Sequence, residues 1–255
     1  MEYSTPVDLE SGHLRLDFYR HAAAHPTGDA QYKGLAIHGY AAIHERVGIL
    51  VQMALAPGAS VLDVASGSGA MCMRLRDFGL TPVGCDLVAE NFRLHGEVEF
   101  MKVNLNLKFP VVFDERFDCV IATEIIEHLE NPRYFLRQCF QTLRPGGLLI
   151  ISTPNVDSPF SRAAYVRTGQ FRWFSDANYT QDGHISPLCL SVLQHAIGET
   201  GFVEKKIESV VPRPLAGIRH WRTIILAKII WFLAKDKPPA GDVLIISMRR
   251  PKLAD

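Results

Sequence analysis

Two carboxylates and an imidazole stand close together in the middle of the chain, at Glu124, Glu127 and His128. If a helix begins at Glu124, spacings of three and four residues place all three side chains on one helix face. Such a set can hold a divalent cation, and its oxygen-rich character favours magnesium or manganese over zinc. His184, in a Gly-His-Ile stretch further along the chain, is a candidate fourth ligand. The sequence therefore predicts a metal site formed by Glu124, Glu127, His128 and His184.

The two histidines have a second candidate role, in proton transfer. Imidazole is the one side chain normally poised near neutral pH, so His128 and His184 are candidate catalytic bases for a hydroxyl group. In an entirely structural alternative, Glu124 starts a helix and His128 packs inside the fold. The residues alone leave these alternatives open.

A glycine-rich segment precedes these residues, at positions 61–69 (Val-Leu-Asp-Val-Ala-Ser-Gly-Ser-Gly). An apolar run that ends in Asp63, then Gly67 and Gly69, then a helical pattern, predicts a strand, a tight turn and a helix start. Glycine adopts positive φ values and has no side chain, so the backbone here can bend sharply and approach a ligand closely. We interpret the segment as the cradle for a bound molecule.

The next predicted strand, residues 82–86, ends in a carboxylate, Asp86. Ligands of doubly wound sheets bind beyond the carboxyl ends of the strands, and an acid about 20 residues after the glycine turn can accept both hydroxyls of a ribose. Asp86 is therefore the candidate ribose ligand. Its alternative role is to cap the following helix.

These motifs, in this order and spacing, resemble those of the class I S-adenosylmethionine-dependent methyltransferases. The resemblance covers about residues 45–210 and the last strand. The family's first motif resembles residues 61–69, its acidic second motif Asp86, its adenine loop residues 103–106, and its later blocks residues 122–132 and 143–155.

The resemblance implies an α/β fold: a doubly wound, mostly parallel, seven-stranded Rossmann-like sheet with helices on both faces and a cap insertion. It implies S-adenosylmethionine as the cofactor. Arg46, on a predicted helix beside the sheet, could form a forked ion pair with the methionine carboxylate of that cofactor, or be an exposed helix arginine. The predicted cofactor-binding residues are Arg46, Asp63, Ala65, Gly67, Gly69, Asp86, Leu87, Asn104, Leu105, Thr123 and Glu124.

Two positions depart from the usual pattern of that family. Ala65 stands where a glycine is common, so a methyl group enters the turn. Asn104 stands where an aspartate is common, and its amide oxygen can still accept a hydrogen bond from an adenine amino group. Neither change argues against cofactor binding.

The Glu-x-x-Glu-His pattern at residues 124–128 is similar to that of the metal-dependent O-methyltransferases of ubiquinone synthesis and of small-RNA 2′-O-methylation. In those relatives the cation gathers substrate hydroxyl oxygens beside the methyl group. The resemblance therefore implies in-line methyl transfer to a hydroxyl of a small or lipid-linked acceptor.

The elements that must position these residues fit one predicted domain, residues 1–255, with a loose arm at residues 1–31. Helices are expected at 32–56, 69–78, 88–95, 132–143 and 186–201, the last with Ser186 as its N-cap. Strands are expected at 61–64, 82–86, 98–103, 117–123, 148–152, 202–209 and 242–248, the last two paired antiparallel at the sheet edge.

An insertion at residues 155–184 shows no long periodic pattern and is rich in aromatic residues, so we expect a substrate cap there. Its aromatic side chains suit a quinone, a phenol or a lipid-linked acceptor. Arg162, Arg167 and Arg172 could instead meet a phosphate or a sugar nucleotide.

An apolar stretch at residues 219–236 predicts a helix before the last strand. It is too short for a bilayer span, which needs about 20 apolar residues. The cations around it are compatible with an interfacial helix that touches lipid, and hence with peripheral membrane contact. A buried helix, or the contact of a homodimer, is the interpretation that the sequence favours.

The composition limits the partners and the compartment. The chain carries 27 basic and 27 acidic side chains, so a nucleic-acid partner is not favoured. Its five cysteines are dispersed and include no Cys-x-x-Cys pair, as expected of reduced thiols. The N-terminus lacks the pattern of a secretion signal. We therefore expect a cytoplasmic protein, with membrane association as a variant of that location.

Two other classes of protein share parts of this pattern. A nicotinamide-dependent oxidoreductase would have a third glycine where Cys72 stands, so it is disfavoured. A non-catalytic cofactor-binding module should have lost key residues of the glycine segment by substitution, whereas Asp63, Gly67, Gly69 and Asp86 are all present.

Overall fold

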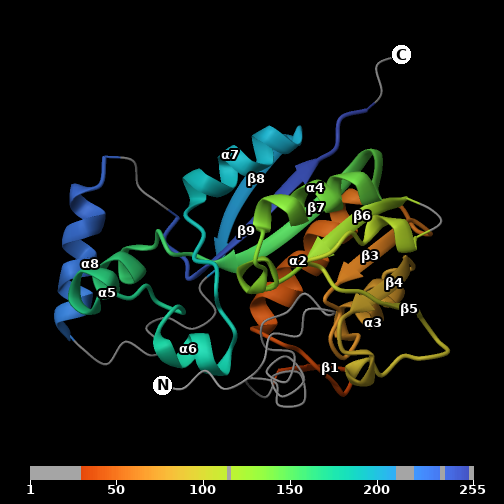
Figure 1. The fold of residues 1–255 in the computed structure, drawn as a ribbon, viewed down its shortest axis with the longest axis horizontal. Coiled ribbons are helices and arrows are strands. Elements are labelled where there is room, and N and C mark those ends of the chain that lie inside the picture. Colours follow the sequence, from red (N-terminus) through yellow and green to blue (C-terminus); the bar gives the residue numbers. More distant parts are fainter. Residues whose placement is uncertain (1–29, 114–115, 211–220, 236–238, 253–255) are drawn as a thin grey trace.

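The computed structural model describes residues 30–113, 116–210, 221–235 and 239–252 (Figure 1). The predicted arm at 1–31 lies outside this part of the chain except for its last two residues. The strands are β1 (Gln31–Tyr32), β2 (Leu35–Ala36), β3 (Ser60–Val64), β4 (Thr81–Asp86), β5 (Glu99–Lys102), β6 (Phe117–Ala122), β7 (Leu143–Pro154), β8 (Val203–Val210) and β9 (Val243–Arg249). The α-helices are α2 (Ala41–Ala54), α3 (Ala70–Asp77), α4 (Pro132–Thr142), α5 (Pro159–Thr168), α6 (Asp176–Gln181), α7 (Leu190–Thr200) and α8 (Trp221–Leu233). Single 3₁₀ turns are η1 (Ala89–Asn91), η2 (Pro110–Val112) and η3 (Ile126–His128).

Seven strands form one sheet in the order β5-β4-β3-β6-β7-β9-β8, which confirms the predicted doubly wound fold. The first five strands of this order are parallel, whereas β9 runs antiparallel to β7 and to β8. The glycine turn, Asp86 and Thr123 follow the carboxyl ends of β3, β4 and β6, which are neighbours in the sheet. The residues predicted to bind the cofactor therefore share one edge of the sheet.

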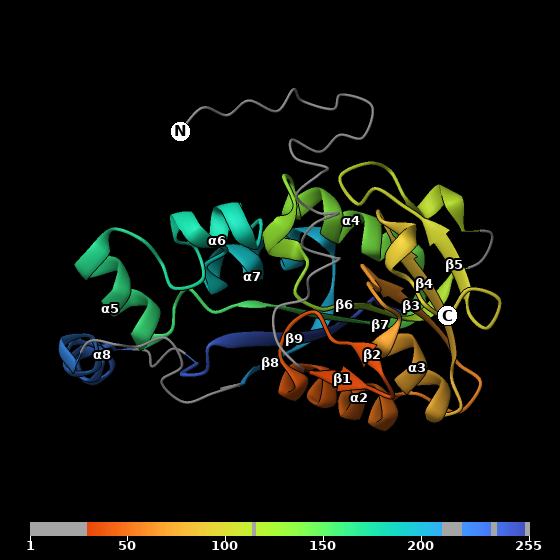
Figure 2. The ribbon, with the colours of Figure 1, turned by 90° about the horizontal axis from the view of Figure 1, so that it is seen from below.

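Helices cover both faces of the sheet, α2 and α3 on one side and α4 and α7 on the other (Figure 2). In α2, Ile43, Val47 and Val51 recur every four residues and are buried against the central strands. Full burial of each such side chain stabilises the fold by about 1.5–3 kcal/mol. Packing on both faces holds the strand ends in fixed positions relative to one another.

The helix predicted at 32–56 begins later than expected. α2 starts at Ala41, and the residues before it form the β1–β2 hairpin. Lys33 and Gly34 occupy its turn with φ values of 50° and 81°, the left-handed pair that a tight two-residue hairpin needs. Tyr32 and Lys33 both donate hydrogen bonds to Asp77 at the C-terminal end of α3, and the Ala36 carbonyl oxygen accepts one from the Ser68 hydroxyl of the glycine turn.

The helix predicted at 88–95 is also wrong, because the chain forms only the single turn η1 there. Phe92 and Leu94 point inward and are buried with Cys72 and Val98 in a small separate core. Inward packing of residues two positions apart does not fit a helix.

The helix predicted at 186–201 starts late, at Leu190 of α7. Ser186 does not cap it, since the Ser186 hydroxyl donates a hydrogen bond to the carbonyl oxygen of Leu129 at 2.7 Å. The first N–H group of α7 donates instead to a carboxylate oxygen of Asp157. Contacts with distant segments have therefore replaced the local cap.

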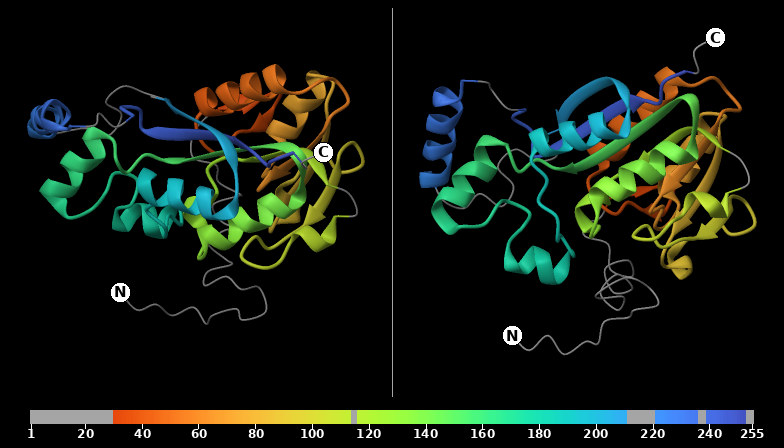
Figure 3. Two further views of the ribbon diagram at one scale, coloured as in Figure 1. Left: turned by 90° about the horizontal axis from the view of Figure 1, so that it is seen from above. Right: turned by 45° about the horizontal axis from the view of Figure 1, so that its top comes forward.

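The predicted cap at 155–184 contains two short helices, α5 and α6, where no long period was expected. Each starts at a serine that accepts a hydrogen bond from a backbone N–H group, Ser158 for α5 and Ser175 for α6. α5 packs against α8 at the end of the molecule remote from β5 (Figures 1 and 3). Of the apolar stretch at 219–236, residues 219, 220 and 236 lie outside the described part. Among the described helices, none is both long and apolar enough to cross a bilayer.

Candidate active site

The glycine turn joins β3 to α3 in the conformation that its residues predict. Gly67 and Gly69 have φ values of 50° and 89°, and Gly69 directly precedes α3. Ala65 has a φ of 58°, which is a strained value for a residue with a Cβ. The turn thus forms with one residue held in a conformation that glycine adopts more easily.

We expect Ala65→Gly to raise the free energy of unfolding by about 0.5–1 kcal/mol. The left-handed conformation costs an alanine about 1–2 kcal/mol, and the greater freedom of glycine in the unfolded chain offsets part of that gain. Thermal unfolding should show a melting temperature about 2–4 °C higher. Ala196→Gly, within α7, is the matched control and should lower stability by about 1 kcal/mol. Equal losses in both variants would contradict the assignment of strain to Ala65.

Asp63, in β3, is buried and faces α3. The Cys72 thiol donates a hydrogen bond to its Oδ2 at 3.3 Å. Burial, which dominates, raises the pKa of Asp63 to about 7. Asp63 therefore joins the strand to the first turn of α3 and supports the glycine turn between them.

Asp86 ends β4 beside the glycine turn. Its two carboxylate oxygens accept hydrogen bonds from the backbone N–H groups of Gly67, at 2.9 Å, and Val88, at 3.0 Å. Burial raises the pKa of Asp86, and the backbone N–H groups oppose that rise. Each carboxylate oxygen has two lone pairs, so both keep the capacity to accept from a diol. Leu87, which follows, is half-buried.

His38 is a residue of this site that sequence reasoning missed. Its ring lies so close to Gly67 that a Cβ on Gly67 would come within 2.7 Å of His38 Cδ2. Although His38 as a whole is exposed, partial desolvation lowers the pKa of its ring, and the Asp86 charge opposes that change. His38 therefore lies over the glycine turn and next to the candidate ribose ligand.

The two residues after His38 continue across the site. Gly39 has a φ of 126°, and a Cβ there would lie 3.6 Å from Glu124 Cγ. The Tyr40 ring meets the Trp173 ring of the cap edge-on, with centroids 6.0 Å apart. Residues 38–40, here called the bridging segment, thus contact the glycine turn, Glu124 and the cap.

Asn104 and Leu105 follow β5 on the side predicted to hold adenine. Asn104 Oδ1 accepts a hydrogen bond from the backbone N–H of Asn106 at 3.0 Å. The Asn104 Nδ2 group is buried and has no hydrogen-bond partner among the described residues. Its unsatisfied group is therefore a donor, not the acceptor that we expected. Leu105 is buried in the larger core.

Arg46 is engaged elsewhere on the sheet. Its guanidinium forms a forked ion pair with Glu208 of β8, with N–O distances of 2.6 and 2.8 Å. This pair joins α2 to the edge strand of the sheet. The geometry does not support the predicted pairing of Arg46 with a cofactor carboxylate, and we omit Arg46 from the proposed site.

Thr123 and Glu124 follow β6, but no α-helix begins at Glu124. Glu124 has a φ of 50° and lies before the turn η3. The Ser152 hydroxyl donates a hydrogen bond to Glu124 Oε1 at 2.7 Å. Burial raises the pKa of Glu124 to about 7. The expected helical face of Glu124, Glu127 and His128 is therefore absent, because Glu124 adopts a left-handed conformation that a right-handed α-helix excludes.

Glu127, His128 and His184 nevertheless lie together, and we call them the carboxylate–histidine group. One ligand atom from each lies within 4.8 Å of the others, whereas Glu124 is outside this set. The two imidazole rings meet edge-on, with centroids 4.9 Å apart. His184 Nδ1 lies 2.6 Å from the carbonyl oxygen of Trp173, so it donates there and Nε2 keeps the lone pair that a metal needs.

The electrostatics of this group fit a bound cation. Glu127 is fully buried, and neither carboxylate oxygen has a hydrogen-bond partner among the described residues. Burial, and then the neighbouring Glu124, raise the pKa of Glu127 well above its usual range. Burial also lowers the pKa of His128 to about 3 and lowers that of His184. Two neutral imidazoles and one unsatisfied carboxylate are a suitable ligand set for a divalent metal.

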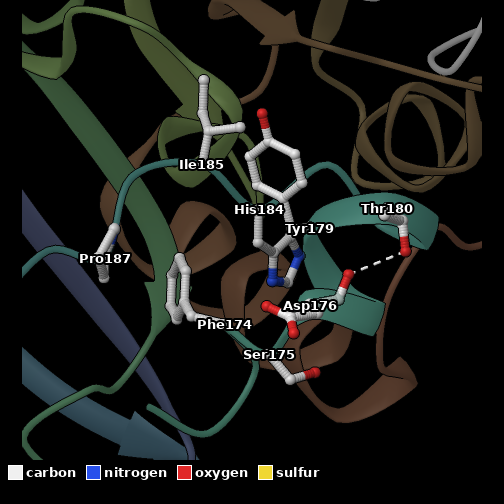
Figure 4. A pocket seen from close by; sticks show the side chains of 8 residues that line it. All are labelled: Phe174, Ser175, Asp176, Tyr179, Thr180, His184, Ile185 and Pro187. Carbon is white, nitrogen blue, oxygen red and sulfur yellow. Dashed lines mark hydrogen bonds between the residues drawn. The ribbon is translucent and has the colours of Figure 1, made fainter. Parts of the chain in front are cut away.

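A cavity of about 300 Å³ opens beside His184 in the predicted cap. The His184 ring lies among Phe174, Tyr179 and Asp176 in the close view (Figure 4). The Trp173 indole nitrogen is buried without a hydrogen-bond partner among the described residues, and sequence reasoning did not single it out. The full lining is Phe174, Ser175, Asp176, Tyr179, Thr180, His184, Ile185 and Pro187. The cap thus offers aromatic and polar surfaces next to the carboxylate–histidine group.

Known proteins resemble this chain over about two thirds of its length. The mitochondrial ubiquinone biosynthesis O-methyltransferase of Rattus norvegicus is 28% identical over 175 residues, which are 64% of this chain and 50% of that protein. The ubiquinone biosynthesis O-methyltransferase of Chelativorans sp. is 25% identical over 194 residues, 72% of this chain and 73% of that one. The chain spans about half the length of the first of these relatives.

A solved structure shares the fold. The S-adenosylmethionine-dependent methyltransferase of Archaeoglobus fulgidus superimposes with a TM-score of 0.57 at 17% identity, over 81% of this chain and 94% of that one. The family described as "Methyltransferase domain" matches residues 37–204, from just before the bridging segment to the start of β8. That match includes the glycine turn, Asp86 and the carboxylate–histidine group. The chain therefore belongs to the methyltransferase domain family, as a class I S-adenosylmethionine-dependent methyltransferase.

Proposed function

We propose that the protein transfers the methyl group of S-adenosylmethionine to a hydroxyl oxygen of a small or lipid-linked acceptor. The observation that carries this proposal is the buried carboxylate–histidine group beside the cavity of the cap. Two distant relatives are ubiquinone biosynthesis O-methyltransferases, which supports oxygen as the acceptor atom.

When bound, S-adenosylmethionine supplies a reactive methyl group on a cationic sulfur. We assign Gly67 and Gly69 to close backbone contact with it, Asp86 to its ribose hydroxyls and Asn104 to a ring nitrogen of its adenine. The rest of the lining of the cofactor site is assigned to Ala65, Leu87, Leu105, Thr123 and Glu124. Asp63 is assigned to holding the glycine turn in place. The chief task of the protein is then to align the acceptor oxygen with the methyl group, which contributes about 7–11 kcal/mol in well-aligned systems.

We assign a divalent cation to the carboxylate–histidine group. When bound, it would lower the pKa of an acceptor hydroxyl. Glu127 offers a carboxylate oxygen, and His128 and His184 offer imidazole nitrogens, so the set contains more nitrogen than the sequence predicted. Such a set suits zinc, whereas a set that included Glu124 would suit magnesium or manganese.

The pKa values separate two roles for the histidines. A catalytic base works best when its pKa lies near the working pH. His128, with a pKa of about 3, binds a proton too weakly for that task, and burial lowers the pKa of His184 as well. Both imidazoles therefore suit metal ligation better than proton abstraction, and we assign proton release to solvent.

The cap favours an acceptor with a ring and hydroxyl groups over a phosphate. Arg162 and Arg172, which could have met a phosphate, form ion pairs with Asp157 at 3.0 Å and Asp242 at 2.9 Å. Phe174 and Tyr179 offer ring faces, and the cavity of about 300 Å³ is large enough for one ring. The acceptor class that fits is a phenol, a catechol or a similar hydroxylated ring, free or lipid-linked.

An acceptor screen with methyl-labelled cofactor tests this function. We expect label on an acceptor oxygen, loss of turnover after exhaustive chelation, and recovery when zinc or manganese is returned. Full turnover after chelation would remove the cation from the proposal. Label on nitrogen or carbon would overturn oxygen as the acceptor atom. Tight cofactor binding without transfer to any catechol, phenol or lipid-linked ring would favour a non-catalytic module.

A further inference from the structure

Helix α8 presents large apolar side chains to solvent at one end of the molecule. The helix packs on α5 of the cap and stands apart from the sheet in every view (Figures 1, 2 and 3). Only Thr223 and Ala227 of this helix are buried. Thr223 accepts a hydrogen bond from Arg167 of α5, which fixes the buried face. The expectation of a buried helix is therefore wrong for this molecule.

Four of the six exposed large apolar residues of α8 form a stripe along the helix, and the other two, Trp231 and Leu233, lie beside it near the C-terminal end. Trp221, Ile225, Ile229 and Phe232 are spaced by four, four and three residues, so they share one face. Their exposed fractions are 66, 48, 48 and 78%. At 100° per residue this face lies opposite Thr223 and Ala227, and hence away from α5. A continuous exposed stripe of this kind marks an interaction surface.

Cations flank the stripe. Arg222 lies on one side of it and Lys228 on the other, by the same helical geometry, and Lys235 follows two residues after the helix ends. All three are exposed, and none forms an ion pair within the part of the chain that the structure describes. Residues 221–235 contain no aspartate or glutamate, although the whole chain has a net charge of zero. The surface around α8 is therefore locally basic and apolar at once.

We infer that α8 docks flat on an anionic lipid surface, with the stripe in the headgroup boundary and the three cations at the lipid phosphates. The helix is about 20 Å long and cannot cross a bilayer, but it can lie in the plane of the interface. Long basic side chains can bury their stems beside the stripe and keep their charges in water. Trp221 at the start of the stripe suits the boundary between headgroups and acyl chains.

A second copy of the chain fits this surface less well. A two-fold contact through the stripe would place Lys228 of both copies at its border, and lysine is depleted in protein interfaces. Lipid phosphates instead complement every charge on this face. Because α8 packs on α5, docking would place the cap at the membrane. There the cap could receive lipid-linked acceptors, and this last step alone rests on the proposed function.

Vesicle sedimentation with the full chain tests the inference. We expect binding to vesicles of phosphatidylcholine with one quarter phosphatidylglycerol, and at least about tenfold weaker binding to phosphatidylcholine alone. Ile225→Glu and Ile229→Glu should each weaken binding about tenfold or more, because each puts a charge into the stripe. Ile49→Glu is the matched control, an isoleucine on α2 with 45% exposure, and it should bind like the wild type.

A charge variant and two further readouts keep the test decisive. Arg222→Gln combined with Lys228→Gln and Lys235→Gln should weaken binding to anionic vesicles by roughly fivefold for each cation removed. All variants should keep wild-type melting temperatures and S-adenosylhomocysteine affinity, which separates docking from folding and from methyl transfer. Absence of vesicle binding, or equal binding by Ile229→Glu, would overturn the inference. So would light scattering that shows a wild-type dimer and a monomeric Ile229→Glu variant.

Discussion

Asp86→Ala should abolish measurable binding of S-adenosylmethionine and S-adenosylhomocysteine in calorimetry. Asp86 is assigned to both ribose hydroxyls, and hydrogen bonds to a charged group are worth about 1.5–3 kcal/mol each. Loss of two such bonds weakens binding by at least about 100-fold. The variant also loses the acceptor for the Gly67 and Val88 N–H groups, so the glycine turn itself loosens.

The controls for this prediction separate ligand contact from folding. Asp86→Asn keeps the size of the side chain but replaces one acceptor oxygen with a donor, so it should fall between the wild type and the alanine variant. Glu97→Ala, an exposed acid paired with Arg76, should bind the cofactor normally. Melting curves of all variants establish that binding is measured on folded protein. Wild-type affinity in Asp86→Ala would remove Asp86 from the cofactor site.

Glu127→Gln should remove metal binding and most turnover while sparing the cofactor. The change preserves volume, and the pKa of Glu127 is held so high by burial and by Glu124 that a neutral amide suits the same place. An amide is a weaker ligand than a carboxylate, however, so bound metal should be lost. Turnover should fall roughly 100-fold or more, because Lewis-acid activation is worth several kcal/mol.

Metal content and affinity, measured without any acceptor, give the primary readout for Glu127→Gln. His128→Ala and His184→Ala should behave alike, with normal S-adenosylhomocysteine binding. Glu130→Gln, an exposed acid three residues further on, is the matched control and should keep its metal. Glu124→Gln decides whether Glu124 joins the ligand set, since it lies outside the group in this structure. Unchanged metal affinity in Glu127→Gln would end the assignment of a cation to this group.

The central sheet could be predicted because its signals are local. Buried parallel strands appear as short apolar runs, and each chemically distinctive residue stands directly after such a run. Gly67, Gly69 and Asp86 are therefore found by position alone, and the order of motifs supplies the topology. The same reasoning located α3 and α4 within a residue or two of their observed ends.

The bridging segment could not be predicted, because nothing local distinguishes it. His38, Gly39 and Tyr40 sit inside what the periodicity favours as one long helix. Their roles arise from contacts with Gly67, Glu124 and Trp173, which are distant in sequence. The hairpin turn at Lys33 and Gly34, which precedes them, lacks the Asn-Gly or Asp-Gly pair that marks most tight hairpins.

The carboxylate–histidine group was predicted for a partly wrong reason. The spacing argument required an α-helix from Glu124, but the positive φ of Glu124 is incompatible with a right-handed helix there. Glu127 and His128 still meet His184, because the cap returns to the end of β6: the backbone N–H groups of Ile185 and Ser186 donate to the Glu127 carbonyl oxygen. Residue types therefore identified Glu127, His128 and His184. The exclusion of Glu124 and the meeting of the other three depend on backbone conformation and a tertiary contact, which the sequence does not display.

The position of β9 inside the sheet affects how this chain emerges from the ribosome. β9 separates β7 from β8, and among the described strands β8 pairs with β9 alone. β8 is complete at Val210, well before synthesis reaches Val243. The nascent chain therefore displays an unpaired strand edge, followed by the apolar stripe of α8, until β9 is free to insert. Both features promote aggregation, so we expect chains that stop before β9 to aggregate more readily than chains that contain it.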